Sequence, residues 1–327
     1  MTVSRRSFLS SLAAAPLAAP FVAGGALLPA AAQAAGAAKV PPATYSFQIG
    51  AARVSALLDG HIDLSMQLVQ PQKPDLAAQA IAETGQRLTN GALKVPVNAY
   101  VIQNAGRTVL VDAGTPDLMG PGLGQAMSGL ELLGIAPEDV DQVLLTHAHI
   151  DHIGGLLNAS GAPRFANAEL ALSDAEHGFL MDDAVLAATP ESFRPAVQAA
   201  RASVSAYGDR VTLFNGEVDL APGLRSLPLP GHTPGHVGFQ LTDGDAGLMI
   251  WGDLIHMTAL QFAYPDWTVA FDADAALTGQ TRRAFLDRAA AEGMLVAGMH
   301  MDFPGLGRVK RAGAGFAYQP AAWQSLL

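Results

Sequence analysis

Short apolar runs separated by turn-forming residues predict a mixture of strands and helices along the chain. Residues 46–58 alternate between apolar and polar side chains, which predicts a half-buried hairpin that bends at Gly50-Ala51. Asp59-Gly60 predicts a turn after it, and the polar, irregular residues 66–96 predict a long excursion over the surface. Asn104-Ala105-Gly106 predicts the bend of a second hairpin. The remaining apolar runs predict strands at 99–102, 108–111, 143–145, 211–214, 224–229, 237–241, 247–251 and 294–298.

Apolar residues recur at helical spacing in other segments. The segment 118–133 ends at Gly134, a residue type that commonly terminates a helix. Helices are also expected around 173–181, 193–206 and 275–291. Strands occur in both halves of the chain, with helices between some of them, so the pattern favours sheets covered by helices, a mixed α/β sandwich.

The first 34 residues have the features of an export signal. Arg5-Arg6 belongs to a Ser-Arg-Arg-Ser-Phe-Leu start typical of the twin-arginine pathway, and Ala32-Gln33-Ala34 resembles a cleavage site. A membrane anchor is the alternative, but two prolines and a Gly-Gly pair interrupt the apolar run and disfavour a stable span. We therefore expect a signal peptide over 1–34, a flexible tail over 35–44, one globular domain over 45–327 and a periplasmic location.

Charge and composition narrow the choice of partners. Two of the 19 basic residues lie in the signal, so the mature chain has 17 basic and 29 acidic residues and a net charge of −12. This balance argues against nucleic acid and against stable membrane association after processing, whereas a homodimer stays open. Because the chain has no cysteine, any metal site must use histidine and carboxylate ligands.

The strongest chemical signal is a dense group of potential metal ligands. In the segment from Thr146 to His152, three histidines and one aspartate fall within six consecutive positions, directly after an apolar run. Such crowding is tolerated when a cation binds the side chains, and imidazole with carboxylate suits zinc, iron, manganese or cobalt. A solvated polar loop is the alternative, but the apolar sequence on both sides disfavours it. The same pattern occurs at His232, Asp253 and His300, because each of them follows a separate apolar run. If these runs are strands of a sheet, the three side chains would lie together in a crevice at the strand ends.

Together these motifs resemble the metallo-β-lactamase superfamily. The His-x-His-x-Asp-His block at 147–152, the segment 231–236, the Gly252-Asp253 pair and the late His300 stand in the order of that family. The resemblance covers about residues 45–320 and implies an α/β fold, a four-layer αβ/βα sandwich with two mixed sheets. Within the superfamily, the branch of methyl parathion hydrolase and related lactonases is the most similar. The supporting segments are 120–124, 252–255 and 303–307.

The resemblance also implies two divalent metal ions in one site. Zinc is favoured, with iron, manganese or cobalt compatible, and the two ions would share a hydroxide that acts as the nucleophile. The chain has neither cysteine nor a Gly-x-Ser-x-Gly motif to supply another nucleophile. By resemblance, His147, His149 and His232 hold one ion, Asp151, His152 and His300 hold the other, and Asp253 bridges them.

Further residues receive roles beside these ligands. Asp112 matches a family aspartate that supports the ligand loop, although it could be a plain turn residue. His236 is expected to be structural because the ligand positions are already filled, and His61 and His177 receive no role.

His256 departs from the family pattern, since related lactonases often place a tyrosine three residues after the bridging aspartate. A histidine there could donate a hydrogen bond to the developing oxyanion or protonate the leaving oxygen, or it could merely line the pocket. We expect Asp151, Asp253 and His256 to take part in catalysis.

The sequence therefore predicts a binuclear metal-dependent hydrolase that opens lactones or cleaves esters of small apolar or aromatic substrates. A phosphotriesterase is the first alternative, because the same hydroxide could attack phosphorus, and a non-catalytic metal-binding protein is the second. An apolar wall at the mouth of the site could come from Phe179, Phe193, Phe262, Tyr264, Trp267 and Phe271.

Overall fold

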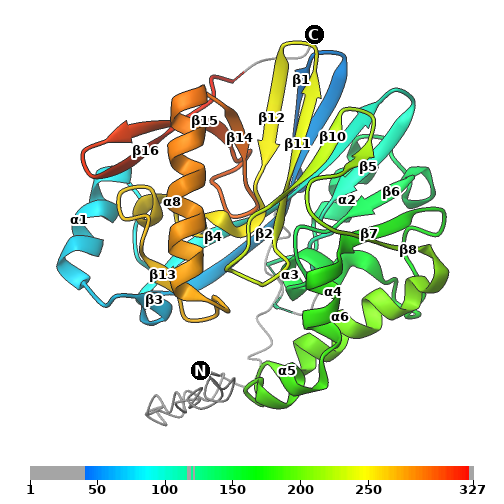
Figure 1. Ribbon diagram of the computed structural model, residues 1–327, viewed down its shortest axis with the longest axis horizontal. Coiled ribbons are helices and arrows are strands. Elements are labelled where there is room, and N and C mark those ends of the chain that lie inside the picture. Colours follow the sequence, from blue (N-terminus) through cyan, green and yellow to red (C-terminus); the bar gives the residue numbers. More distant parts are fainter. Residues whose placement is uncertain (1–40, 116–118, 121, 324–327) are drawn as a thin grey trace, which may run out of the picture. The chain divides into compact units, whose positions relative to one another are not determined.

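Two seven-stranded sheets form the framework of the protein, and both mix parallel and antiparallel pairs. The computed structural model describes residues 41–115, 119–120 and 122–323 (Figure 1). The first sheet has the order β1 (Ala43–Ile49), β2 (Ala52–Ser65), β4 (Ala92–Asn104), β5 (Arg107–Val111), β6 (Gln142–Leu144), β7 (Glu169–Ser173), β8 (Val211–Phe214). The second has the order β16 (Gly315–Pro320), β15 (Leu306–Ala312), β14 (Leu295–Ala297), β12 (Ala246–Ile250), β11 (Val237–Asp243), β10 (Leu224–Pro228), β9 (Asp219–Ala221). A two-stranded sheet pairs β3 (Val69–Gln70) with β13 (Thr268–Val269).

Helices cover the outer faces of the two large sheets (Figure 1). One apolar core joins the first sheet to α2, α4 and α6, and another joins the second sheet to α8. A third core lies between the sheets, so the layers follow the order helix, sheet, sheet, helix, as the resemblance predicted. The helices are α1 (Pro74–Thr84), α2 (Ala126–Leu132), α3 (Ile150–Ile153), α4 (Asp174–Met181), α5 (Asp183–Ala188), α6 (Arg194–Tyr207), α7 (Thr258–Gln261) and α8 (Ala275–Glu292). Short 3-10 turns occur at Met66–Leu68, Pro137–Asp139, Gly154–Leu156, Gly208–Arg210 and Gly252–Leu254.

Strand β12 shows why the sequences of the central strands are almost continuously apolar. Leu248 and Ile250 face the core between the sheets, whereas Met249 and Trp251 face α8. Successive strand residues point to opposite faces, and both faces of this strand are buried. The buried part of the strand, Leu248 to Ile250, therefore needs apolar residues at each position.

Several predicted boundaries were wrong. The predicted turn at Asp59-Gly60 is a bulge inside β2, where the pairing with β4 shifts register between Leu58 and Gly60. The segment 66–96 is not an irregular excursion, because it contains β3, α1 and the start of β4. Helix α1 begins with Pro74 at its first turn and ends at Gly85 in the left-handed region, and its apolar residues pack with those of α7.

The helix predicted over 118–133 starts at Ala126, after a glycine-rich stretch that disfavours helix. The positions 116–118 and 121 lie outside the described residues, as do the predicted signal peptide and residues 35–40 of the predicted tail. Strand β1 begins at Ala43, inside the segment predicted as tail. Among the described residues, none of the helices is long and apolar enough to cross a membrane. The pattern also missed α3, β7, α5, β9, α7, β13, β15 and β16.

Candidate metal centre

The predicted ligands meet where strand ends from both large sheets converge. Strands β5, β6 and β7 run parallel in one sheet, and β12 and β14 run parallel in the other. His147 follows β6, His232 follows β10, Asp253 follows β12 and His300 follows β14. Because the carboxyl ends of these strands reach one edge of the sandwich, residues distant in sequence become neighbours.

A first cluster joins three histidines to one carboxylate. Its ligand atoms all lie within 4.8 Å of one another. His147 Nε2 is 3.6 Å and His232 Nε2 is 3.4 Å from Asp253 Oδ2. His149 Nδ1 lies 3.0 Å from His232 Nε2. These four residues are the set that the resemblance implied for one metal ion.

A second cluster lies beside the first, and Asp253 of the first cluster also approaches it. Asp151, His152 and His300 also place their ligand atoms within 4.8 Å of one another. His152 Nε2 is 3.3 Å from Asp253 Oδ1, and His300 Nε2 is 3.1 Å from Asp253 Oδ2. All seven predicted ligands are therefore together, with Asp253 between the two groups.

Unpaired buried atoms at this point fit a cation. Among the described residues, His147 Nε2, His152 Nε2 and Asp253 Oδ1 are buried and have no hydrogen-bond partner. A buried polar atom left unsatisfied costs about 1–3 kcal/mol. Divalent metals accept nitrogen and oxygen donors of this kind, so the residues fit the two ions that the family implies.

Asp112 holds the ligand loop through three contacts. Its Oδ2 accepts hydrogen bonds from Thr146 Oγ1 at 2.8 Å and, at 2.7 Å, from the Nδ1 of His152, and its Oδ1 accepts one from Thr146 N at 2.8 Å. The residue adopts a left-handed φ of 57°, which is strained for a residue with a side chain. This geometry favours the supporting role over that of a plain turn residue, because the strained backbone aims the carboxylate at His152.

Two more ligand histidines have outer partners that the motif did not reveal. His232 Nδ1 donates to Asp272 Oδ1 at 2.7 Å, and His300 Nδ1 donates to the carbonyl oxygen of Pro96 at 2.8 Å. Each bond orients its ring so that Nε2 faces the cluster. Asp272 follows β13 and has no motif around it, so sequence reasoning gave no signal for it.

His236 supports Asp253 rather than joining the ligands. Its Nδ1 donates to the carbonyl oxygen of Leu229 at 2.8 Å, which leaves Nε2 to accept the backbone N–H of Asp253 at 2.9 Å. Gly252 allows this approach, because its φ is 57° and a Cβ there would overlap His236 Nε2. His61 is exposed in β2 and His177 is half-buried in α4, and neither belongs to the metal-ligand clusters.

Burial and neighbouring charges set the protonation of the ligands. Burial lowers the pKa of His149 to about 4 and that of His232 to about 3, so both are neutral at pH 7, the form that binds metal. Burial by itself would lower the pKa of His300. The neighbouring carboxylates of Asp253 and Asp151 outweigh burial and raise this pKa to about 10. A metal ion would therefore displace a proton from His300 on binding.

His256 lies inside the same crowded group. It is 2% exposed, and its Nε2 is 3.1 Å from Asp253 Oδ2. Its ring stacks on His300 with centroids 5.3 Å apart, and neither ring nitrogen has a hydrogen-bond partner among the described residues. Its backbone N–H donates to Gln261 Oε1 at 2.7 Å, which fixes the loop. His256, Asp253 and His300 form a third group whose ligand atoms lie within 4.8 Å of one another, so His256 is placed to contact a bound ion or a molecule on it.

The predicted aromatic wall is largely wrong. Phe271 contacts the site, with its ring centroid 5.9 Å from that of His232 and 5.4 Å from that of His256. Phe262 instead packs against Trp251 in the core under α8. Phe193 is 58% exposed at the start of α6, and Phe179 is half-buried in α4.

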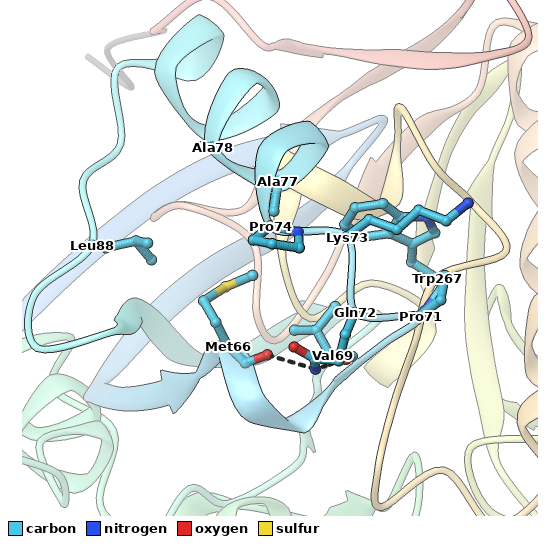
Figure 2. Close-up of a pocket in the computed structure, with 10 residues that line it drawn as sticks. All are labelled: Met66, Val69, Pro71, Gln72, Lys73, Pro74, Ala77, Ala78, Leu88 and Trp267. Carbon is cyan, nitrogen blue, oxygen red and sulfur yellow. Dashed lines mark hydrogen bonds between the residues drawn. The ribbon is translucent and has the colours of Figure 1, made fainter.

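Trp267 belongs to a separate pocket beside α1. It stacks on Tyr264 with centroids 4.6 Å apart, and both rings belong to the apolar cluster around α1 and α7. Figure 2 shows this pocket, whose wall includes Met66, Val69 and Ala77 and none of the predicted ligands. Trp267 is therefore a wall of that pocket.

With this geometry established, comparison with known proteins decides the family. A model of the metallo-beta-lactamase superfamily matches residues 93–300, which contain all seven predicted ligands. The chain belongs to the metallo-β-lactamase superfamily. The family predicted from the motifs is thereby confirmed, and the protein is a metal-dependent hydrolase of this superfamily.

Relatives within the superfamily include lactonases. The N-acyl homoserine lactonase AiiB of Agrobacterium fabrum (strain C58 / ATCC 33970) is 26% identical over 251 residues, which cover 68% of this chain and 79% of that protein. The crystal structure of hydrolase AbOPH has a TM-score of 0.81 and 26% identity, covering 88% of this chain and 99% of that one. AidC, a dizinc quorum-quenching lactonase in complex with the product N-hexanoyl-L-homoserine, has a TM-score of 0.81, covering 87% of this chain and 99% of that one. At 24% identity, AidC supports the fold alone.

Proposed function

We propose that this superfamily member is a binuclear metal-dependent lactonase. The observation that carries the proposal is the pair of ligand clusters that share Asp253 at one edge of the sandwich. One ion would be held by His147, His149 and His232, the other by Asp151, His152 and His300, with Asp253 between them. When bound, two divalent cations, zinc in the first instance, would lower the pKa of a shared water and polarise a carbonyl oxygen.

His256 would assist at the substrate carbonyl. Its buried ring lies beside Asp253 and His300, where an imidazole N–H can donate a hydrogen bond to a bound oxygen. Such a bond strengthens as negative charge develops on the carbonyl oxygen during attack, and this lowers the barrier. The other residues orient the site: Asp272 and Asp112 fix the rings of His232 and His152.

The substrate class follows from the relatives and from the surroundings of the site. AiiB is an N-acyl homoserine lactonase and shares 26% of its aligned residues with this chain, so an N-acyl homoserine lactone is the first substrate to test. Phe271 is 36% exposed and lies against three histidine rings, where it offers an apolar edge to an acyl chain or an aromatic ring. Apolar esters and aromatic lactones would fit the same edge.

Removal of metal should abolish turnover of an N-hexanoyl homoserine lactone, dihydrocoumarin and a p-nitrophenyl ester. A chelator should strip both ions, and added Zn²⁺ should restore activity together with a stoichiometry of two ions per chain. Metal analysis and initial rates measure these effects, with enzyme carried through the same dialysis without chelator as the control. Chelator-resistant turnover, or no turnover of all three substrates by the metal-loaded enzyme, would contradict the proposal.

His256→Leu should separate lactone from phosphotriester hydrolysis. Loss of one donor to an oxyanion typically costs about 100- to 1,000-fold in kcat, so lactone turnover should fall by that order. Activity on a p-nitrophenyl phosphotriester should stay or rise, because a good leaving group needs no donor from His256. Metal content is measured in parallel, and His177→Leu in α4 is the control. Equal losses on both substrates would remove the reason for preferring lactones to phosphotriesters.

A further inference from the structure

Glu176 is a buried carboxylate that contacts both loops of the three-histidine cluster. It is 2% exposed and lies in the first turn of α4. It accepts a hydrogen bond from Ala148 N at 2.9 Å and another from Thr233 Oγ1 at 2.5 Å. Ala148 lies between His147 and His149, and Thr233 directly follows His232, so one side chain is linked to both loops.

The local sequence places this carboxylate. Ser173 is the N-cap of α4 and accepts the backbone N–H of Glu176 at 3.1 Å, so the segment Ser173-Asp174-Ala175-Glu176 has the pattern of a capping box. In a capping box the glutamate bonds back to the N-cap backbone, but here its oxygens accept from the two ligand loops instead. The hydroxyl of Ser173 meanwhile donates to the carbonyl oxygen of Gly235 at 2.6 Å. Both polar groups of this helix start are therefore directed at the histidine loops.

Gly235 makes the close approach of these segments feasible. A Cβ at this position would overlap the backbone nitrogen and the Cα of Glu176. The loop of His232 therefore packs directly on the first turn of α4, with no side chain between them. Such a contact leaves little freedom in the distance between the loop and the helix.

The two loops come from different sheets, which gives this bridge its importance. His147 and His149 follow β6 of the first sheet, whereas His232 follows β10 of the second. The bonds that Asp112 makes stay within the first sheet and its ligand loop. Glu176, in contrast, connects the two sheets at the position where one ion would lie.

We propose that Glu176 is a positioning residue that sets the separation of His232 from His147 and His149 before metal binds. It acts through Ala148 and Thr233 and bonds neither His147 nor His232 itself. The inference rests on the proposed two-metal function and deepens it. The ion at the three-histidine cluster depends on this bridge, whereas the ion at Asp151, His152 and His300 does not.

The decisive measurement is Zn²⁺ affinity at each cluster separately. In an Asp151→Ala background the three-histidine cluster dominates binding, and in a His149→Ala background the other cluster does. Adding Glu176→Gln should weaken Zn²⁺ binding by about 10- to 100-fold in the first background, the usual effect of losing an outer-shell partner. It should leave affinity unchanged in the second. Competition with a chromophoric chelator gives both affinities, and the visible spectrum of the Co²⁺-substituted protein reports the ligand geometry.

Matched variants keep the test informative if Glu176→Gln folds poorly. Thr233→Val removes the hydroxyl at nearly constant shape and should weaken the three-histidine cluster, whereas Thr233→Ser keeps the hydroxyl and should retain its affinity. Ile49→Ala in β1 destabilises a remote part of the core and should leave both affinities intact. Unchanged affinity in Glu176→Gln and Thr233→Val, or equal loss at both clusters, would overturn the positioning role alone. A wild-type protein that does not bind two ions would overturn the proposed function itself.

Discussion

Asp253→Ala should abolish turnover and release both metal ions. The carboxylate lies 3.6 Å or less from ring nitrogens of His147, His152, His232 and His300, so its loss removes the one ligand common to both clusters. The stabilisation that a bound metal supplies to the transition state amounts to several kcal/mol, and each 1.36 kcal/mol is tenfold in rate. We therefore expect a fall of about three orders of magnitude or more in kcat/KM, measured together with metal content.

Asp245→Asn provides the control for this variant. Asp245 is exposed between β11 and β12, close in sequence to Asp253 but remote from the ligand clusters. It should keep full activity and both ions. If Asp253→Ala bound two ions and retained more than a tenth of wild-type activity, Asp253 would not be the shared ligand.

Asp112→Asn should reduce metal affinity without unfolding the protein. The aspartate accepts a hydrogen bond from His152 Nδ1, so once metal displaces the second proton the neutral ring keeps its hydrogen on Nδ1 and presents Nε2 to the ion. An amide group could present N–H to Nδ1 instead and favour the tautomer with hydrogen on Nε2, which cannot ligate. We expect a loss of about 10- to 100-fold in affinity for the ion at His152, measured by zinc titration.

Asp141→Asn is a matched control for Asp112→Asn. Asp141 also accepts a backbone N–H near a strand end, that of Thr108 at 2.7 Å, but it is exposed and does not contact His152. Its amide variant should bind zinc normally. Equal zinc affinity in both variants would show that the tautomer of His152 does not depend on Asp112.

The loop of Asp253 and His256 is held by buried side chains that carry no motif. Gln261 accepts the backbone N–H of His256 at 2.7 Å and donates to the carbonyl oxygen of Trp267 at 3.1 Å. Arg282 on α8 is fully buried and donates to the carbonyl oxygens of Leu254 and Trp267 at 2.6 Å each. Burial lowers the pKa of Arg282 to about 10, so the guanidinium stays charged at pH 7. The carbonyl oxygens around the guanidinium replace the water that it loses on burial, and the hydrogen bonds that it donates hold the loop of Asp253 and His256 in place.

Export through the twin-arginine pathway stays a prediction from the sequence. The segment that would carry it lies outside the described residues. We propose a periplasmic location on the strength of the Arg5-Arg6 pattern alone. Fractionation of cells that produce the full chain would test it, and accumulation of the unprocessed chain in the cytoplasm would contradict it.

The ligand set could be predicted from the sequence because its signals are local. The 147–152 block is dense in histidine, and His232, Asp253 and His300 each come within four residues of the end of an apolar strand. Position after a strand determines which end of a sheet a side chain reaches, so their meeting at one edge was predictable without coordinates. The superfamily, and with it the layered sandwich, followed from the order of these motifs.

Tertiary structure alone decided which residues support the ligands. Asp272 bonds to His232 although the two are 40 positions apart in the sequence, and Pro96 bonds to His300 at a separation of 204 positions. Glu176 bonds to ligand loops that follow strands of two different sheets. Helix α1 was likewise missed, because its packing against α7 outweighs a weak local pattern. A hydrogen bond or a packing contact between distant segments depends on how the folded segments are oriented and buried. Such contacts produce no periodic pattern of apolar and polar residues in the sequence. The sequence by itself therefore predicted the candidate donors and the fold, whereas the folded chain determined how each of these side chains is oriented.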